Sequence, residues 1–452
     1  MAEEGLKVLT WLSKHVFFPL WEIKDGARRR QYLRELSASQ WWKPEMLRQQ
    51  QWERVREIVK YAYEHCAYYK SRYANLEFDS TLNTWDDFRR LPLLTKRDIR
   101  ENEGKLLSKA FRREDLVQAK TGGSTGTALR LYFDEPCQQM RNAAAMRSDR
   151  WAGWDIGMKV AAIWGNPPVA DTVKKKLRNS LLDRMIYLDT MNINDDSIGL
   201  FLKDWRRERP RFVFGHAHSI YILATYLRRM GIDDFRPHGV VATSMMLLAP
   251  ERRVIEEVFG CRVTNRYGCE EMGLIACECD RHDGLHLNVD HLIIEFLRDD
   301  GTEAELGEEA NIVVTDLINH GMPLVRYRIE DRGISTNRRC SCGRGLPLME
   351  RIIGRQADFL KRPDGSLVAG VSLVERTLTA IPGIEQMQLI QNDLDLLQVN
   401  VVKDKSYTRE SEVKLTTELN DVFGQSVTIK VQYVLELDKM GRGKYRFAIC
   451  NV

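Results

Sequence analysis

Short apolar segments alternate with helical segments between residues 136 and 260, and this alternation constrains the fold more than any other feature. The expected strands are residues 160–165, 212–215 and 239–244, and the expected helices are residues 138–151 and 219–230. Strands that alternate with helices form a mostly parallel sheet with helices on both faces. The sequence therefore predicts an α/β fold for this part of the chain.

The ends of these expected strands are the first candidate site. Ligands of parallel sheets bind beyond the carboxyl ends of the strands. Trp164, His216, His218 and Ser244 lie at those ends, so their position alone makes them candidates for a binding pocket. A histidine in such a pocket is as often structural as it is a ligand contact.

The regions on either side have other patterns. Residues 1–110 are expected to be mostly helical, and residues 289–334 are strand-like with Gly and Asp turns. The last hundred residues indicate a small α+β unit. Its expected strands are residues 386–391, 396–402, 427–435 and 445–450, and its expected helix is residues 409–423. We expect an N-terminal domain of residues 1–352 and a C-terminal domain of residues 353–452.

A glycine-rich loop lies between a charged segment at 112–120, which we expect to be helical, and an expected strand at 129–133. The loop consists of Thr121, Gly122, Gly123, Ser124, Thr125 and Gly126. Glycine lets the backbone approach an anion closely, and free N–H and hydroxyl groups can surround phosphate oxygens. The loop lacks the Gly-Lys-Ser/Thr of a Walker loop, and a polar hairpin turn is an equal alternative on these residues alone.

Charge and cysteine content bear on the class of protein. With 68 basic and 64 acidic residues the net charge is +4, which argues against nucleic acid as the main partner. No apolar stretch approaches the ~20 residues of a transmembrane helix, and the first residues lack the features of a signal peptide. Nine unevenly spaced cysteines fit a reducing compartment, so we expect a cytoplasmic protein.

Residues 9–21 are rich in aromatic side chains but are interrupted by Lys14 and His15. We expect this segment to pack on the protein's own core, with contact to a membrane or a partner as the alternative. The following run of Arg28, Arg29 and Arg30 is expected to be a solvated helix face rather than a membrane-binding patch.

The glycine-rich loop, taken with motifs later in the chain, resembles the phosphate-binding loop of adenylate-forming enzymes. The most similar branch contains phenylacetate–coenzyme A ligases and CapK-type proteins. The family's loop usually continues with Pro and Lys, where this chain has Ala128 and Leu129. The resemblance covers nearly the whole chain, with the motifs in the family's order. It implies a large α/β domain followed by a small, mobile α+β domain.

Two motifs carry the resemblance further. The segment that begins Tyr267-Gly268 matches the family's Tyr-Gly-x-x-Glu, which implies that the ring stacks on adenine and that Glu271 helps hold Mg²⁺. Mg²⁺ prefers one or two carboxylates plus phosphate oxygens, and it offsets the repulsion between two anions. A segment that ends at Asp331 resembles Tyr-Arg-Thr-x-Asp, which implies that Asp331 binds the ribose hydroxyls. Solvated acidic turns are the alternative for both.

The C-terminal part carries two more matches. The segment that contains Arg355 resembles the Gly-Arg-x-Asp-Asp hinge between the domains, with Ala357 in place of the first Asp. A later glycine segment resembles Gly-Lys-x-Arg, whose lysine, here Lys444, contacts the substrate carboxylate and the phosphate during adenylation. A flexible loop suits a charge that enters and leaves a site, although a basic surface turn is the alternative. The resemblance implies Lys444, Glu271 and Arg355 as catalytic residues.

The sequence departs from the family's usual motifs in two segments, one expected beside the nucleotide and one expected near the acyl pocket. Residues 243–247 lie where relatives often carry a glutamate beside adenine, and Ser244 stays a candidate because backbone groups can also read adenine. The segment around His216 and His218 replaces a Gly-Tyr-Pro-Ser-like segment near the acyl pocket. With Trp164, these histidines suggest a polar or hydroxylated substrate.

Four of the nine cysteines form two C-x-C pairs, which indicates a metal site rather than a disulfide framework. Thiolate and imidazole ligands suit tetrahedral Zn²⁺. The resemblance places the ligands at Cys279, His286, Cys340 and Cys342, with Cys277 and His282 as close competitors. Four side chains leave no open position, so the zinc would be structural. Unligated buried thiols are the alternative.

Together these features predict a ligase that uses ATP, Mg²⁺ and a structural Zn²⁺. A carboxylic acid would form acyl-AMP with release of pyrophosphate, and the acyl group would then pass to coenzyme A after the small domain rotates. The alternatives are an amine, hydroxyl or carrier-protein thiol as acceptor, or a non-catalytic nucleotide-binding assembly protein. Glu271, Asp331 and Lys444 favour the enzyme, whereas Ala357 and Met246 favour the non-catalytic protein. The sequence names neither the acid nor the oligomeric state, and a homodimer stays open.

Overall fold

The computed structural model describes residues 2–76, 81–120, 129–165, 172–190, 193–355, 359–438 and 445–452. Helices dominate the first hundred residues, as predicted. The α-helices are α1 (Ala2–Leu12), α2 (Phe18–Asp25), α3 (Arg29–Ser39), α4 (Pro44–His65), α5 (Ala67–Tyr73), α6 (Trp85–Arg90), α7 (Lys96–Glu101), α8 (Glu103–Leu106), α9 (Glu135–Trp151), α10 (Val173–Arg178), α11 (Asp195–Glu208), α12 (Ala217–Arg229), α13 (Ala249–Phe259), α14 (Gly370–Ala380) and α15 (Arg409–Phe423). Two π-helical turns, Ser13–Phe17 and Asn179–Asp183, and two 3₁₀ turns, Ala74–Leu76 and Arg113–Asp115, complete the helical elements. None of the helices in these ranges is long and apolar enough to cross a membrane.

The strands lie mainly in the second half of the chain. They are β1 (Val117–Lys120), β2 (Arg130–Phe133), β3 (Val160–Trp164), β4 (Met185–Asp189), β5 (Phe212–His216), β6 (Gly239–Thr243), β7 (Val263–Cys269), β8 (Gly273–Glu278), β9 (Leu285–Leu287), β10 (Leu292–Leu297), β11 (Glu309–Asp316), β12 (Tyr327–Ser335), β13 (Leu348–Arg355), β14 (Phe359–Lys361), β15 (Leu367–Ala369), β16 (Ile384–Asp393), β17 (Leu396–Lys403), β18 (Thr428–Tyr433) and β19 (Ala448–Cys450).

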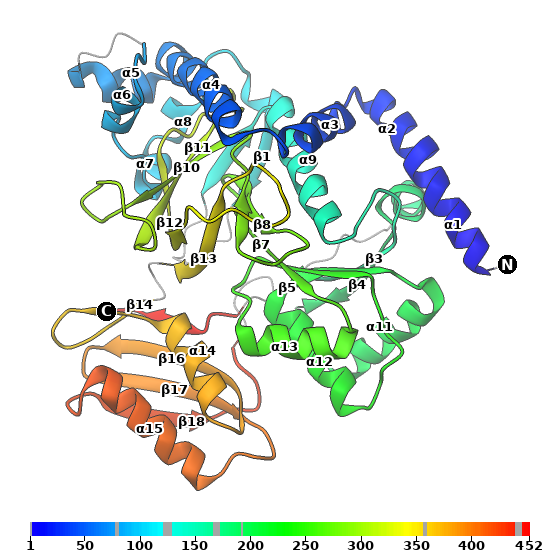
Figure 1. The fold of residues 1–452 in the computed structure, drawn as a ribbon, viewed down its shortest axis with the longest axis vertical. Coiled ribbons are helices and arrows are strands. Elements are labelled where there is room, and N and C mark those ends of the chain that lie inside the picture. The colour runs from blue at the N-terminus through cyan, green and yellow to red at the C-terminus, as the bar shows by residue number, and fades with distance from the viewer. Residues whose placement is uncertain are drawn as a thin grey trace.

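An 11-stranded sheet of order β10-β11-β12-β13-β9-β8-β7-β6-β5-β3-β4 forms the centre of the molecule. The pairs from β4 to β7 are parallel, and α11, α12 and α13 pack on this half, as Figure 1 shows. The pairs from β7 to β10 are antiparallel, and the loops that connect consecutive strands from β7 to β13 contain no helix. The predicted α/β class is confirmed, and the parallel part is the segment in which strands and helices alternate.

The prediction of a helix at residues 112–120 is wrong. A single 3₁₀ turn is followed by β1, which pairs antiparallel with β2 from Val117 opposite Phe133 to Lys120 opposite Arg130. The backbone groups of a strand need partners, and pairing with β2 supplies them for β1. Such pairing between segments overrides the helix preference of a charged run.

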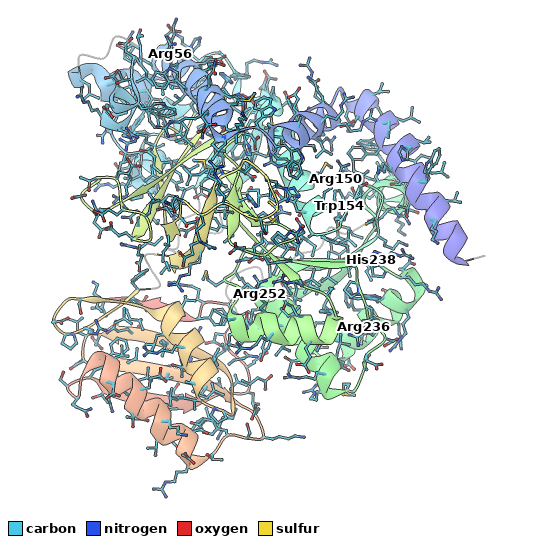
Figure 2. All side chains as sticks on the ribbon, viewed as in Figure 1. Arg56, Arg150, Trp154, Arg236, His238 and Arg252 are labelled. Carbon is cyan, nitrogen blue, oxygen red and sulfur yellow. The ribbon has the colours of Figure 1, made fainter. Side chains whose placement is uncertain are left out.

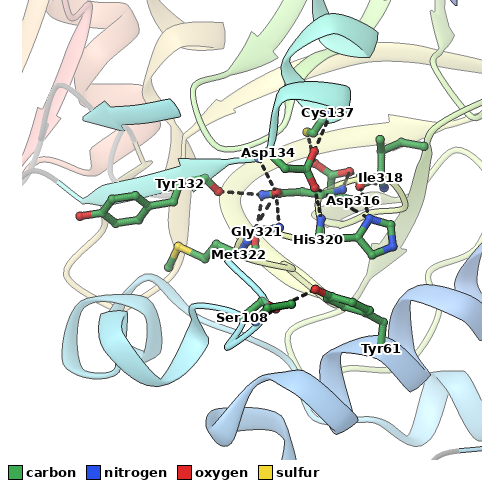
Figure 3. Close-up of polar contacts among 12 residues, drawn as sticks. Tyr61, Ser108, Tyr132, Asp134, Cys137, Asp316, Ile318, His320, Gly321 and Met322 are labelled. Atoms are coloured by element: carbon green, nitrogen blue, oxygen red, sulfur yellow. Dashed lines mark hydrogen bonds and ion pairs between the residues drawn. The ribbon is translucent and has the colours of Figure 1, made fainter. Parts of the chain in front are cut away.

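A buried polar network anchors β2 and the start of α9 (Figure 3). The Asn319 side chain donates to Tyr132 O at 3.0 Å and accepts from the Asp134 N–H at 3.3 Å. Asp134 accepts from the backbone N–H groups of Cys137 at 2.8 Å and His320 at 2.7 Å. These bonds fix the strand that follows the glycine-rich loop. Residues 121–126 of that loop lie outside the described residues.

A separate four-stranded sheet of order β18-β17-β16-β19 lies near the C-terminus, with α14 and α15 beside it (Figure 1). Its apolar core includes Leu389, Val399 and Leu415. The boundary expected between residues 352 and 353 falls within β13, which belongs to the central sheet. The division into domains stays a prediction.

Candidate functional site

Two tyrosine–carboxylate hydrogen bonds link the β7–β8 hairpin to β12. The Tyr267 hydroxyl donates to Asp331 Oδ2 at 2.8 Å, and the Tyr327 hydroxyl donates to Glu271 Oε1 at 3.0 Å. Glu271 and Asp331 are 6% and 9% exposed. The structure therefore brings together Tyr267 and Glu271, which the sequence nominated from one motif, and Asp331, which it nominated from another.

Cys269 lies near enough to Glu271 and Asp331 for both charges to act on its thiol. Burial, with the neighbouring charges of Glu271 and Asp331, raises the pKa of the Cys269 thiol well above its usual range. Burial and the Glu271 charge likewise raise the pKa of Tyr327, so its hydroxyl stays protonated and can donate. Glu271 is a carboxylate of low exposure, and carboxylate oxygens are the ligands that Mg²⁺ prefers. The residues present fit a magnesium site.

Tyr327 belongs to this hydrogen-bonded cluster, although the sequence analysis did not name it as a candidate. Tyr327 lies in the matched motif that ends at Asp331, and this position could have indicated that its side chain lies near the predicted nucleotide site. Its hydrogen-bond partner, Glu271, is 56 residues away in the chain, and only the folded sheet brings the two together.

Two backbone features support the same cluster. A Cβ at Gly268 would lie 2.3 Å from Gly273 O, so the close approach of β7 and β8 requires glycine there. On the neighbouring strand, Arg355 of β13 lies opposite Asp331 of β12 in the sheet register. The backbone thus places Arg355 of the predicted hinge beside Asp331, the predicted ribose-binding carboxylate. Residues 356–358 of that hinge, which include Ala357, lie outside the described residues.

Ser244 lies at the carboxyl end of β6, as predicted, and has a positive φ of 65°. The residues that follow Ser244 in the sequence contact the C-terminal part of the chain. Leu248 is fully buried in a cluster with Val371 and Phe447, and Met245 and Met246 pack against this cluster. The segment predicted to lie beside adenine therefore forms part of the contact with the C-terminal sheet.

The strand-end aromatic residues separate into two groups. Trp164 of β3 and His216 of β5 lie together, with ring centroids 4.3 Å apart, and Phe214 stacks on Trp164 at 5.4 Å. This group fits the predicted acyl pocket. An apolar wall with one imidazole can hold an organic acid and select among its polar substituents.

His218 has other neighbours. Its Nδ1 lies 2.5 Å from Glu251 Oε1, and its ring contacts Tyr445 and Phe447 at centroid distances of 4.4 and 5.2 Å. These contacts connect α12 and α13 to the residues that follow the C-terminal glycine loop. The assignment of His218 to the acyl pocket stays a prediction, whereas its contact with the C-terminal part is observed. Lys444 itself lies outside the described residues.

Four potential metal ligands converge between β8, β9 and the loop before β13. The ligand atoms of Cys279, His286, Cys340 and Cys342 all lie within 4.8 Å of one another. Cys279 Sγ is 3.6 Å from Cys340 Sγ, and Cys342 Sγ is 3.3 Å from His286 Nε2. Two sulfurs bound to one tetrahedral zinc at about 2.3 Å lie about 3.7 Å apart, so this spacing fits zinc.

The surroundings of the cluster also suit a metal. His286 Nδ1 lies 3.1 Å from the Leu346 carbonyl, which can only accept, so this nitrogen carries the proton and Nε2 faces the thiols. Burial lowers the pKa of His286 to about 4, which keeps the imidazole neutral near pH 7. The backbone N–H groups of Arg281 and Arg344 donate to Cys279 Sγ and Cys342 Sγ, each at 3.4 Å.

The competing candidates have other partners. His282 Nδ1 lies 3.1 Å from Glu278 Oε2, and the Cys277 thiol donates to Glu278 O at 3.3 Å. Arg252, labelled in Figure 2, donates to Glu278 Oε1 at 2.8 Å. The geometry therefore favours the set of four over Cys277 and His282.

Comparison with known proteins agrees with this architecture. A family model described as the CapK C-terminal domain matches residues 360–451. Protein CapK of Staphylococcus aureus is 26% identical over 413 residues, which cover 88% of this chain and 88% of that protein. A phenylacetate-coenzyme A ligase of Thermus thermophilus is 25% identical over 389 residues, or 81% of this chain and 83% of that protein. The chain is thus homologous to CapK and to phenylacetate-coenzyme A ligases, the branch that the motifs indicated.

A solved structure shares the fold of this ligase. The crystal structure of 2-hydroxyisobutyryl-CoA ligase in the postadenylation state, in complex with R3-HIB-AMP, matches it with a TM-score of 0.69 at 18% identity, over 88% of each chain. The predicted family, fold class and enzyme class are confirmed. The substrate, the acceptor and the roles of individual site residues stay predictions.

Proposed function

We propose that this ligase activates a carboxylic acid with ATP and transfers the acyl group from acyl-AMP to coenzyme A. The observation that carries the proposal is the cluster of Tyr267, Glu271 and Asp331, held together by two tyrosine–carboxylate bonds. Homology to phenylacetate-coenzyme A ligases supports coenzyme A as the acceptor.

The proposed roles follow from the positions of the residues. The ring of Tyr267 stacks on adenine, and Asp331 accepts hydrogen bonds from the ribose hydroxyls, since an ionised carboxylate can accept from both. Glu271 holds Mg²⁺, which offsets the repulsion between the attacking carboxylate and the α-phosphate. Trp164 and His216 line the acyl pocket, and their mixed character fits an organic acid with a polar substituent.

The direct test of the proposal is ATP–pyrophosphate exchange over a panel of carboxylic acids, followed by detection of the product with coenzyme A. We expect exchange with at least one acid and a coenzyme A thioester of that acid. Exchange without a thioester, but with an amide or ester when an amine or alcohol is offered, would replace coenzyme A by the alternative acceptor. Absence of exchange and of ATP binding would contradict the proposal.

We predict that Asp331→Asn raises the KM for ATP. A hydrogen bond to a charged group contributes about 1.5–3 kcal/mol, so its loss corresponds to roughly 10- to 100-fold. The matched variant Tyr267→Phe keeps the stacking ring and removes the 2.8 Å bond from the hydroxyl to Asp331, so its KM should change by less than about tenfold. Steady-state exchange kinetics at saturating acid measure both. An equal effect of the two variants would assign the role of Tyr267 to its hydroxyl rather than its ring.

We also propose that Cys279, His286, Cys340 and Cys342 bind one structural zinc. Structural zinc couples to folding, because the unfolded chain has no preformed site. Protein purified without added metal should contain about one zinc per chain, and Cys340→Ser should lose it and melt roughly 5 °C or more below wild type. Cys277→Ser is the control: that thiol makes another contact, so the variant should keep its zinc. Wild-type protein without zinc, or a Cys340→Ser variant that retains zinc, would contradict the assignment.

A further inference from the structure

The N-terminal helices present an apolar stripe on their outer side. Val8, Trp11, Leu20 and Ile23 are 59%, 58%, 59% and 73% exposed. His15 lies between Trp11 and Leu20, and the five residues are three, four, five and three positions apart along the chain. Steps of three or four keep a helix face, and the step of five crosses the π-helical turn, which accommodates one extra residue. The π turn thus keeps the two halves of the stripe on one face.

The opposite side of the same helix is docked on the protein. The Ser13 hydroxyl donates to Leu181 O at 2.6 Å, and Lys14 Nζ lies 2.5 Å from Asp155 Oδ2. Arg150, labelled in Figure 2, binds Oδ1 of the same carboxylate at 2.9 Å. These contacts hold the helix along one edge of the molecule (Figure 1) and direct the stripe outward.

The helix and the turn that follows it are basic. Between residues 2 and 30 there are six lysines and arginines and four carboxylates, so the segment has a small positive net charge. One of these carboxylates, Glu22, is buried and pairs with Arg30. Lys7 and Lys24 are exposed at the two ends of the stripe. An apolar face with tryptophan and basic flanks has the chemistry of a helix that lies in the interface of an anionic bilayer.

We propose that this stripe docks the protein on anionic membrane surfaces, with the helix parallel to the surface. A second copy fits the stripe less well. A symmetric pair would bring the same basic patch of each copy close to the other, and like charges repel. None of the described helices is long and apolar enough to cross a membrane, so the contact is with the surface. The proposal does not depend on the proposed enzymatic function.

The test is flotation of the full-length chain with vesicles of phosphatidylcholine alone and of phosphatidylcholine with phosphatidylglycerol. We expect binding to the anionic vesicles that weakens with salt. The double variant Trp11→Glu/Ile23→Glu should lower the partition coefficient at least about tenfold, because it removes two apolar contacts and adds negative charge. The double variant Leu200→Glu/Val413→Glu adds the same charge at positions that are 63% and 58% exposed elsewhere, and it should bind as wild type does.

Light scattering and thermal melting of each variant complete the test. Equal melting temperatures exclude unfolding as the cause of lost binding. We expect equal melting temperatures because the substituted side chains are exposed. Failure of the wild type to bind anionic vesicles, or equal binding by the stripe variant, would overturn the proposal. So would a wild-type dimer that the stripe variant converts to a monomer, since the occupant would then be a second copy.

Discussion

Glu271→Gln should lower ATP–pyrophosphate exchange about 10²- to 10³-fold, the typical cost of one preorganised electrostatic group. Glutamine keeps the size of the side chain and an oxygen that can accept the bond from the Tyr327 hydroxyl, now 3.0 Å from Oε1. The substitution therefore removes the negative charge and leaves the fold in place. The apparent affinity for Mg²⁺ should fall with the rate, because the missing charge is the proposed metal ligand.

Glu270→Gln is the matched control for this experiment. Glu270 is the adjacent residue but is exposed, and its backbone carbonyl accepts a hydrogen bond from the Arg141 guanidinium at 2.6 Å. The Glu270 variant should exchange pyrophosphate at nearly the wild-type rate with an unchanged Mg²⁺ requirement. If the Glu271 variant behaves in the same way with an accepted acid, the magnesium assignment is wrong.

Lys444→Ala should abolish the first half-reaction and spare the second. During adenylation the phosphate and the attacking carboxylate gather negative charge, and loss of a cation there costs about 10²- to 10³-fold. After acyl-AMP has formed, rotation of the small domain should remove the lysine. The variant should therefore fail to make acyl-AMP from acid and ATP but should consume supplied acyl-AMP with coenzyme A at a near wild-type rate.

The described residues beside the lysine loop support this experiment. Leu437 and Tyr445 flank the loop and share one apolar cluster, against which Met245 packs, and the Tyr445 ring lies 4.4 Å from the His218 ring. Both ends of the loop are thus tied to the N-terminal part in this arrangement. Lys439→Ala, a charge loss at the far end of the loop, is the control and should have little effect on either half-reaction. Equal loss of both half-reactions in the Lys444 variant would contradict the rotation model.

The sequence by itself predicted those features that depend on local pattern. The alternation of strands and helices predicted the α/β class because each element must bury an apolar face with its own period. Resemblance to two short family motifs nominated Glu271 and Asp331, since each motif is contiguous in the chain. The residue types of the C-x-C pairs predicted a zinc-type cluster before any geometry was available.

The tertiary structure decided what depends on contacts between distant segments. The pairing of β1 with β2 converted an expected helix into a strand, and the bond from Tyr327 to Glu271 joined residues that no local pattern connects. The preference for Cys279 over Cys277 as a predicted zinc ligand also depends on the fold. The two cysteines belong to the same C-x-C pair, but their thiols make different contacts. Hydrogen bonds and metal–ligand bonds require atoms to lie within about 2–4 Å of one another. The number of residues between two positions in the chain does not reveal whether they come that close.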